Sequence, residues 1–137
     1  MTVLPVLLDT DILSAIMRQD PVVIPKAQEY LLANEQFTFS IITRYEILRG
    51  LKAKGASKQL AAFDHFCKVN TILSLTDEII IKAAEIYAIL RQRGELIGDA
   101  DILIAATALT NETCVVTNNL NHFQRIPELQ VQNWLQT

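Results

Sequence analysis

Short apolar runs alternate along the chain with longer segments of helical periodicity. The apolar runs predict strands at residues 4–8, 37–42, 71–75, 113–117 and 129–132. Between them, apolar residues recur at helical spacing over 12–18, 23–34, 44–54, 57–68, 77–93 and 100–111. Gly55 is expected to stop the third of these helices. The last helix is apolar almost throughout, so we expect it to be buried.

This alternation predicts an α/β fold. Strands that alternate with helices favour a three-layer α/β/α sandwich, with helices covering both faces of a central, mainly parallel β-sheet. A length of 137 residues is typical of one domain, so we expect a single domain over 1–137. Ligands of such sheets bind beyond the carboxyl ends of the strands.

Acidic side chains occur at these strand ends. Asp9 ends the first predicted strand, and Glu46 follows the second by four residues. Asp99 and Asp101 open the buried helix that leads into the fourth strand. The end of that strand carries Thr117, Asn118 and Asn119. The carboxyl ends of parallel strands meet at one edge, so these groups are expected to converge.

Helix capping is an alternative role for each acid. Asp11 fits an N-cap for the helix at 12, and Thr43 with Glu46 matches the capping box T-x-x-E. Asp99 or Asp101 fits a cap for the buried helix. A glutamate in a first turn can cap and also direct an oxygen elsewhere, so the two roles are compatible.

A cluster of acids favours a cation. Two carboxylates about 5 Å apart repel by about 3 kcal/mol at an effective dielectric near 20, and a cation removes that cost. Oxygen ligands indicate Mg²⁺ or Mn²⁺ rather than zinc, and such ions commonly support phosphodiester hydrolysis by an activated water. His65 and His122 show no ligand spacing, and we interpret both as ordinary surface or partly buried residues.

Composition narrows the protein class. Half of the residues are hydrophobic, a fifth are charged, and the net charge is −3, which argues against broad non-specific nucleic-acid binding. The apolar runs are too short to span a membrane, and the N-terminus lacks the pattern of a signal peptide. Cys67 and Cys114 lie in contrasting contexts, so we expect no disulfide between them. We therefore expect a soluble cytoplasmic protein.

Four segments carry a resemblance to a known family. "LLDTDILSAI", "TRYEILRGL", "IGDADILIAATAL" and "VVTNNLNHFQRIP", in this order, resemble the PIN-domain ribonucleases, specifically the VapC-type toxins of bacterial type II toxin–antitoxin systems. The resemblance covers essentially the whole chain. It implies a Mg²⁺- or Mn²⁺-dependent endoribonuclease that cleaves RNA, often a transfer RNA. It also implies a cognate antitoxin that blocks the site, and a homodimer.

The resemblance assigns roles to the acids. By position it implies Asp9, Glu46 and Asp101 as metal ligands, because Asp101 stands immediately before "ILIAA" as in the family. Asp99 then becomes an accessory catalytic acid. The fourth family position is often an acid but is Asn119 here, which puts a second metal in doubt.

The remaining polar groups receive supporting roles. Asp11 is often asparagine in relatives, which fits a structural cap. Thr10 and Thr117 can hydrogen-bond a water or a phosphate oxygen. Residues 44–58 carry five basic residues against Glu46 alone, a net charge of +4. We interpret four of them as RNA-binding: Arg44, Arg49, Lys52 and Lys54. A plain solvated helix face is the alternative.

Two other functions compete with this interpretation. The pairs "DTD" and "GDAD" also suggest a haloacid-dehalogenase-like phosphatase, with Asp9 as nucleophile and Asp11 as general acid. Leu13 opposes it, and so does the region shortly before the later acids, where that family expects a lysine and this chain has Arg91 and Arg93. A catalytically silent PIN-like module that binds RNA or protein is favoured only by Asn119 in place of an acid.

Overall fold

The computed structural model describes residues 4–136 and contains a five-stranded parallel sheet. The strand order is β3–β2–β1–β4–β5, and every neighbouring pair is parallel. The strands are β1 (Val6–Leu8), β2 (Thr38–Ser40), β3 (Thr71–Leu73), β4 (Cys114–Val116) and β5 (Val131–Gln132). The strand order reverses at β1, where the chain leaves for β2 on one side and β4 lies on the other.

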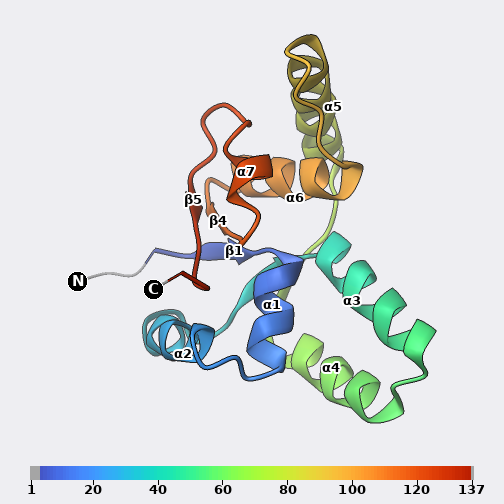
Figure 1. The fold of residues 1–137 in the computed structure, drawn as a ribbon, viewed down its shortest axis with the longest axis vertical. Coiled ribbons are helices and arrows are strands. Elements are labelled where there is room, and N and C mark those ends of the chain that lie inside the picture. Colours follow the sequence, from blue (N-terminus) through green and yellow to red (C-terminus); the bar gives the residue numbers. More distant parts are fainter. Residues whose placement is uncertain (1–3, 137) are drawn as a thin grey trace.

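Helices cover both faces of this sheet (Figure 1). Below β1 in that view lie α1 (Thr10–Met17), α2 (Val23–Asn34), α3 (Ile41–Lys54) and α4 (Ser57–Val69). Above it lie α5 (Asp77–Gln92), α6 (Asp99–Thr110) and α7 (Leu120–Phe123). The predicted α/β/α sandwich is confirmed. The four-residue α7 was not predicted, because so short a helix has no apolar periodicity.

Each layer has its own apolar core, and β1 serves both. Val6 and Leu8 pack into the core under α1–α4, whereas Leu7 packs into the core under α5–α7. This alternation is the period of a strand whose two faces are both covered. In α6, the residues from Ile104 to Ala108 are fully buried, as the sequence predicted.

Most predicted boundaries hold within a few residues. Helix α3 begins at Ile41, three residues before the predicted start, because the Ser40 side chain accepts a hydrogen bond from Ile42 N and caps it there. Gly55 adopts φ 64° and ends α3, as predicted. The two cysteines, Cys67 and Cys114, are free thiols in this structure.

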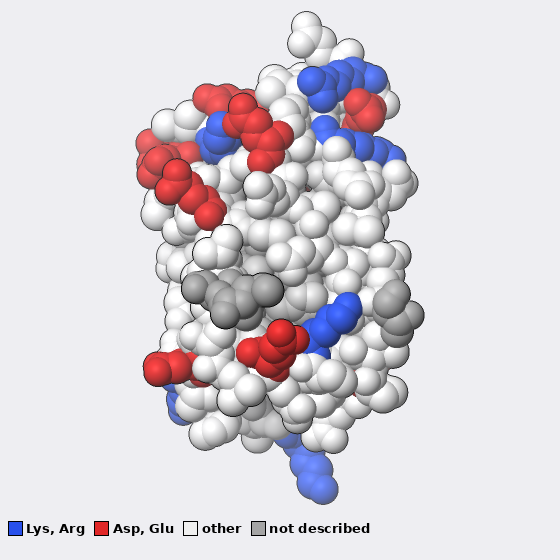
Figure 2. Space-filling model, turned by 90° about the vertical axis from the view of Figure 1, so that its left-hand side faces the viewer, with Lys and Arg blue, Asp and Glu red and all other residues white. Residues whose placement is uncertain are grey.

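Figure 2 shows the side of the molecule at which β1 begins. Acidic and basic side chains form small separate groups there, with wide uncharged areas between them. No helix within residues 4–136 has the length and apolar character needed to cross a membrane.

Candidate active site

Asp9 lies at the carboxyl end of β1, directly before α1. Its backbone N donates to Val116 O, which continues the β1–β4 pairing. Its Oδ1 accepts from Thr10 N at 2.7 Å, so Asp9 is the N-cap of α1. Its Oδ2 accepts from Thr117 Oγ1 at 2.8 Å. The residue is only 6% exposed, and two adjacent strand ends therefore hold both oxygens of one buried carboxylate.

Glu46 reaches the same edge from α3. Thr10 Oγ1 donates to Glu46 Oε1 at 2.6 Å and lies 3.1 Å from Thr43 Oγ1. Glu46 Oε2 is 3.8 Å from the Arg49 guanidinium. Because Thr10 also donates its backbone N–H to Asp9, this one residue connects two of the predicted ligands.

Asp101 enters from the first turn of α6. Its Oδ2 is 2.8 Å from His122 Nδ1, which lies 2.7 Å from the side-chain amide of Asn119. The backbone N of Asn119 donates to Thr117 Oγ1 at 2.9 Å, and Thr117 holds Asp9. A continuous chain of contacts therefore runs from Glu46 through Asp9 to Asp101.

His122 is partly buried, as predicted, but its contacts with Asp101 and Asn119 were not predicted. Asp101 Oδ2 and the Asn119 side-chain nitrogen both lie within hydrogen-bond distance of His122 Nδ1, so the tautomer of the ring decides which of the two contacts this nitrogen makes as a donor. The available sequence signal was the i, i+3 spacing of Asn119 and His122 at the end of a predicted strand. His65, on α4, is exposed, as predicted.

Asp11 is not the N-cap of α1, because Asp9 holds that position. Asp11 Oδ2 instead accepts from Asn118 N at 3.0 Å and ties α1 to the loop after β4. Asp11 Oδ1 is buried without a hydrogen-bond partner, the one such side-chain atom within residues 4–136. A buried carboxylate oxygen without a donor is costly, and a cation or its water would satisfy it.

The two other capping predictions were also wrong. The cap of α3 is Ser40, so Thr43 and Glu46 form no capping box and Glu46 is free to face Thr10. The N-cap of α6 is Gly98, and no side chain caps it. Asp99 is exposed on the first turn, and none of the contacts described for residues 4–136 connects it to the other acids.

The acids at this edge disfavour one another's ionisation. Burial, the largest cause, and the charges of Asp11 and Asp101 together raise the pKa of Asp9 from 3.8 to about 7, although the hydrogen bonds from Thr117 and Thr10 act to lower it. Burial, with Asp101 contributing, also raises the pKa of Asp11. These mutual effects place Asp9, Asp11 and Asp101 close together in a site that gains from added positive charge.

The donor set fits a hard divalent cation. The groups that converge are carboxylate, hydroxyl and amide oxygens, the ligands that Mg²⁺ and Mn²⁺ prefer. Within residues 4–136 no three acidic, histidine or cysteine side chains are already arranged as a metal cage. Thr10 holds Glu46, and His122 holds Asp101. The second lone pairs of these oxygens remain for a cation.

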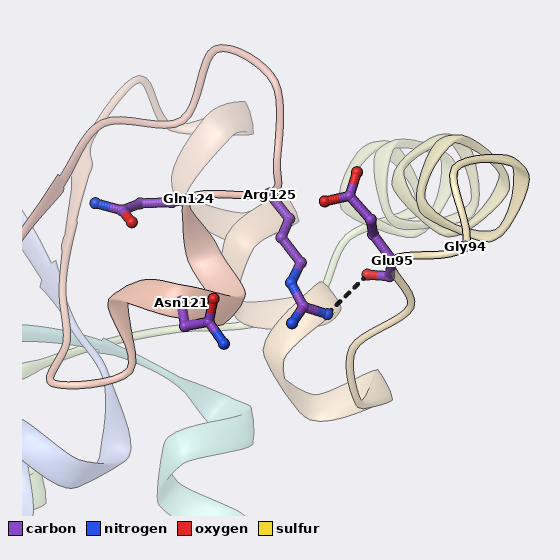
Figure 3. A pocket seen from close by; sticks show the side chains of 5 residues that line it. All are labelled: Gly94, Glu95, Asn121, Gln124 and Arg125. Carbon is purple, nitrogen blue, oxygen red and sulfur yellow. Dashed lines mark hydrogen bonds between the residues drawn. The ribbon is translucent and has the colours of Figure 1, made fainter.

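The loop before α6 is anchored by Arg125, which follows α7. Its Nη1 donates to Glu95 O at 3.2 Å and to Leu96 O at 3.3 Å, and the first of these bonds is drawn in Figure 3. A polar cavity of about 370 Å³ lies there, lined by Gly94, Glu95, Asn121, Gln124 and Arg125. The region after β4 thus contacts the loop before α6 through Arg125 and the first turn of α6 through His122.

The predicted RNA-binding residues divide between two sides of α3. Arg49 contacts Glu46, and Lys52 is exposed one turn further along. Arg44 is half-buried and hydrogen-bonds the Cys67 sulfur on α4. Lys54 lines a groove of about 570 Å³ between α1, α3 and α4. The structure therefore brings Arg49 next to the acids and directs Arg44 and Lys54 elsewhere.

Known proteins share this architecture. Residues 6–129 match the family model for the PIN domain. Ribonuclease VapC2 of Rickettsia felis is 30% identical over 129 residues, which cover 93% of this chain and 96% of the relative. The tRNA(fMet)-specific endonuclease VapC of Salmonella typhimurium is 30% identical over 108 residues, covering 78% and 82%. The crystal structure of Rickettsia felis VapBC2 bound to a promoter DNA fragment aligns with a TM-score of 0.85 at 28% identity, over 96% of this chain and 99% of the solved one.

Proposed function

The chain belongs to the PIN-domain family and, within it, to the VapC ribonucleases, and from this premise we propose that it is a divalent-cation-dependent endoribonuclease toxin. The observation that supports this most directly is the contact chain that joins Glu46, Asp9 and Asp101 at the point where the strand order reverses. That is the place at which parallel sheets bind their ligands. The haloacid-dehalogenase-like alternative is wrong for a chain of this family.

We propose that Asp9, Glu46 and Asp101 hold one Mg²⁺ or Mn²⁺ ion. When bound, the ion would lower the pKa of a water molecule, so that hydroxide is available to attack at neutral pH, and would offset the charge of the phosphate. Asn119 contributes no carboxylate, which favours a single ion. Two observations support a cation here: Asp11 Oδ1 is buried without a hydrogen-bond donor, and the pKa of Asp9 is raised. Each reflects negative charge that no nearby positive charge offsets.

The surrounding residues position these carboxylates. Thr10 and Thr117 fix the directions of Glu46 and Asp9, and His122 fixes that of Asp101. In the hydrolysis, the water oxygen would bond to phosphorus while one carboxylate accepts a proton from that water. The bond from phosphorus to the ribose oxygen would break, and the leaving oxygen would keep the electron pair and take a proton from solvent. Asp99, exposed on the first turn of α6, is an accessory acid.

The proposed substrate is RNA, with transfer RNA as the first candidate. The relative from Salmonella typhimurium is named as a tRNA(fMet)-specific endonuclease, and its match to this chain supports that choice. Arg49 and Lys52 are the predicted basic residues best placed to contact RNA phosphates beside the acids. An RNA substrate implies that the protein works in the cytoplasm.

A cognate antitoxin is the proposed inhibitor. The similar solved structures include VapBC complexes from Rickettsia felis and Salmonella typhimurium. The acid cluster suits a basic side chain from such a partner, which would take the place of the cation. We further propose a homodimer, supported by the apolar side chains that α5 leaves exposed, among them Ile80, Ile81 and Tyr87.

Cleavage of total cellular RNA tests the proposal. Purified protein free of antitoxin is incubated with Mg²⁺, with Mn²⁺ or with EDTA, and the new RNA ends are sequenced. We expect cuts at discrete sites that require metal and disappear in Asp9→Asn. A folded wild-type protein that binds RNA but never cuts it would contradict the proposal and favour the silent binding module.

A further inference from the structure

Tyr45 presents an aromatic ring to solvent directly before the proposed ligand Glu46. Its exposed fraction is 58%, and of the nine aromatic residues in the chain only Tyr87 is also exposed. The remaining aromatic side chains are buried or half-buried in the two cores and their margins. Nothing in the packing of α3 requires a large ring at this position, so its place beside the acids calls for another explanation.

Arg49 connects this ring to the acids. Its guanidinium lies over the Tyr45 ring at 5.1 Å from the centroid, and its Nη2 is 3.8 Å from Glu46 Oε2. Glu46, Arg49 and Tyr45 therefore form a row that leads outward from the candidate metal site. The contact with the ring restrains the guanidinium, which reduces the entropy that Arg49 would lose on binding a ligand.

Lys52 extends the row along α3. Positions 45, 49 and 52 are spaced i, i+4 and i+7, so they share one face of the helix. At a rise of 1.5 Å per residue they span about 10 Å, the length of roughly three stacked nucleotides at about 3.4 Å each. We refer to Tyr45, Arg49 and Lys52 as the α3 platform.

One exposed ring with two neighbouring cations is the combination that binds single-stranded nucleic acid. Bases stack on aromatic rings, and arginine and lysine contact the phosphates. We propose that the α3 platform binds the substrate RNA, with Tyr45 stacking on an unpaired base and Arg49 and Lys52 contacting the adjoining phosphates. This inference rests on the proposed ribonuclease function, because the bound strand would pass its next phosphodiester to the acids.

A protein partner fits another side of α3 better. Ile47 and Leu51, together with Met17 of α1, line the groove of about 570 Å³ between α1, α3 and α4, where apolar surface is available. The α3 platform instead offers one ring and two cations on an exposed face. Its chemistry therefore favours a nucleobase with phosphates over an apolar peptide.

The test measures RNA binding in the Asp9→Asn background, where the proposed cleavage is blocked. The probe is a 12-nucleotide single-stranded RNA of mixed sequence with 2-aminopurine at successive positions. Tyr45→Ala is expected to weaken binding about 5- to 150-fold, from the usual range for loss of one stacked base. It should also remove the fluorescence quenching of one particular 2-aminopurine. Tyr45→Phe, which keeps the ring, should bind within twofold of the parent.

Two controls separate stacking from a general structural effect. Leu32→Ala removes an 89% exposed side chain from α2 and should not change RNA affinity. An RNA that is abasic at the position sensitive to Tyr45 should bind the parent and Tyr45→Ala equally well. Unchanged RNA affinity in Tyr45→Ala would overturn the inference. So would a loss that persists in full with the abasic RNA.

Cleavage by the wild-type protein, measured in parallel, distinguishes the two levels of the proposal. Metal-dependent cleavage with no effect of Tyr45→Ala on RNA affinity would support the ribonuclease proposal and overturn the RNA-binding role of the α3 platform. A wild-type protein that neither binds nor cuts RNA would contradict both. A Tyr45→Ala variant could bind RNA normally but lose affinity for the antitoxin encoded by a neighbouring small open reading frame. That result would assign the surface to a protein partner and overturn the RNA role.

Discussion

His122 Nδ1 lies 2.8 Å from Asp101 Oδ2, although 21 residues separate them along the chain. The contact joins the short helix α7 to the first turn of α6, and the side-chain amide of Asn119 lies 2.7 Å from the same ring nitrogen. Side chains that orient a metal ligand in this way commonly matter for affinity almost as much as the ligand itself. This contact holds Asp101, the proposed metal ligand, in position in the metal-free protein.

We predict that His122→Ala weakens Mn²⁺ binding about 10- to 100-fold, because Asp101 loses the partner that orients it. Isothermal titration calorimetry measures this directly, without reference to cleavage. His65→Ala, which removes an exposed imidazole from α4, is the matched control and should leave the affinity unchanged. Equal Mn²⁺ affinities in the two variants would show that His122 does not position the ligand.

The raised pKa of Asp9 predicts how stability depends on pH in the absence of metal. Between pH 3.8 and about 7, folded Asp9 retains a proton that the unfolded chain has lost. The free energy of unfolding should therefore fall as the pH rises from about 4 to about 7, by on the order of a few kcal/mol, and change little above that. Urea denaturation in EDTA at pH 5 and pH 8 measures the difference.

Asp9→Asn should make the same metal-free protein more stable at pH 8. The amide cannot ionise, so the cost of a buried charge disappears, and its oxygen can still accept from Thr10 N. The pH dependence should become flatter as well. Asp64→Asn, at an exposed position on α4, should behave like the wild type. An Asp9→Asn protein less stable than wild type at pH 8 would mean that the buried charge of Asp9 does not lower the free energy of unfolding.

Lys52 should contribute a phosphate contact that depends on salt. We expect Lys52→Gln to reduce the slope of log affinity for tRNA against log salt concentration by about 0.7–0.9, the value for one lost contact. Lys68→Gln changes the same charge on α4, where Lys68 is 73% exposed and pairs with Asp64. Identical slopes for these two variants would show that Lys52 contacts no phosphate and would favour the alternative, a plain solvated helix face.

The apolar surface of α5 should mediate self-association. Ile81 is 55% exposed there, and we expect Ile81→Asp to weaken a homodimer by at least about tenfold, because a carboxylate would be buried without a partner. Sedimentation equilibrium measures the change. Leu32→Asp places the same charge on α2 as a control. A dimer that tolerates Ile81→Asp must use another surface.

The main features of the site were predictable because parallel strands end at a common edge. Asp9 ends β1 and Thr117 follows β4, so pairing of those strands alone brings them together. Glu46 required only that a helix begin after β2. The placement of these residues at one edge of the sheet followed from the element order, without knowledge of any distant contact.

The contacts of the supporting residues were not predictable in this way. The sequence predicted Asp11 as the cap of α1, whereas the structure has Asp9. The helix begins two residues earlier than predicted, which is the usual uncertainty of a helix end. The pairing of His122 with Asp101 depends on how the chain after β4 folds back over α6, and a four-residue helix leaves no periodic signal. The row from Glu46 to Tyr45 depends on side-chain directions that only the packed helix defines.

Single-turnover cleavage of a purified transfer RNA by Asp9→Asn, Glu46→Gln and Asp101→Asn tests the central claim most directly, with Asp64→Asn as the matched control. We predict that each of the three variants cuts at least about 100-fold more slowly than wild type in Mg²⁺ or Mn²⁺, and that EDTA stops the wild-type reaction. Asp64→Asn should cut at the wild-type rate. Wild-type rates in the three variants, or cleavage that continues in EDTA, would contradict the assignment of these acids to a catalytic cation.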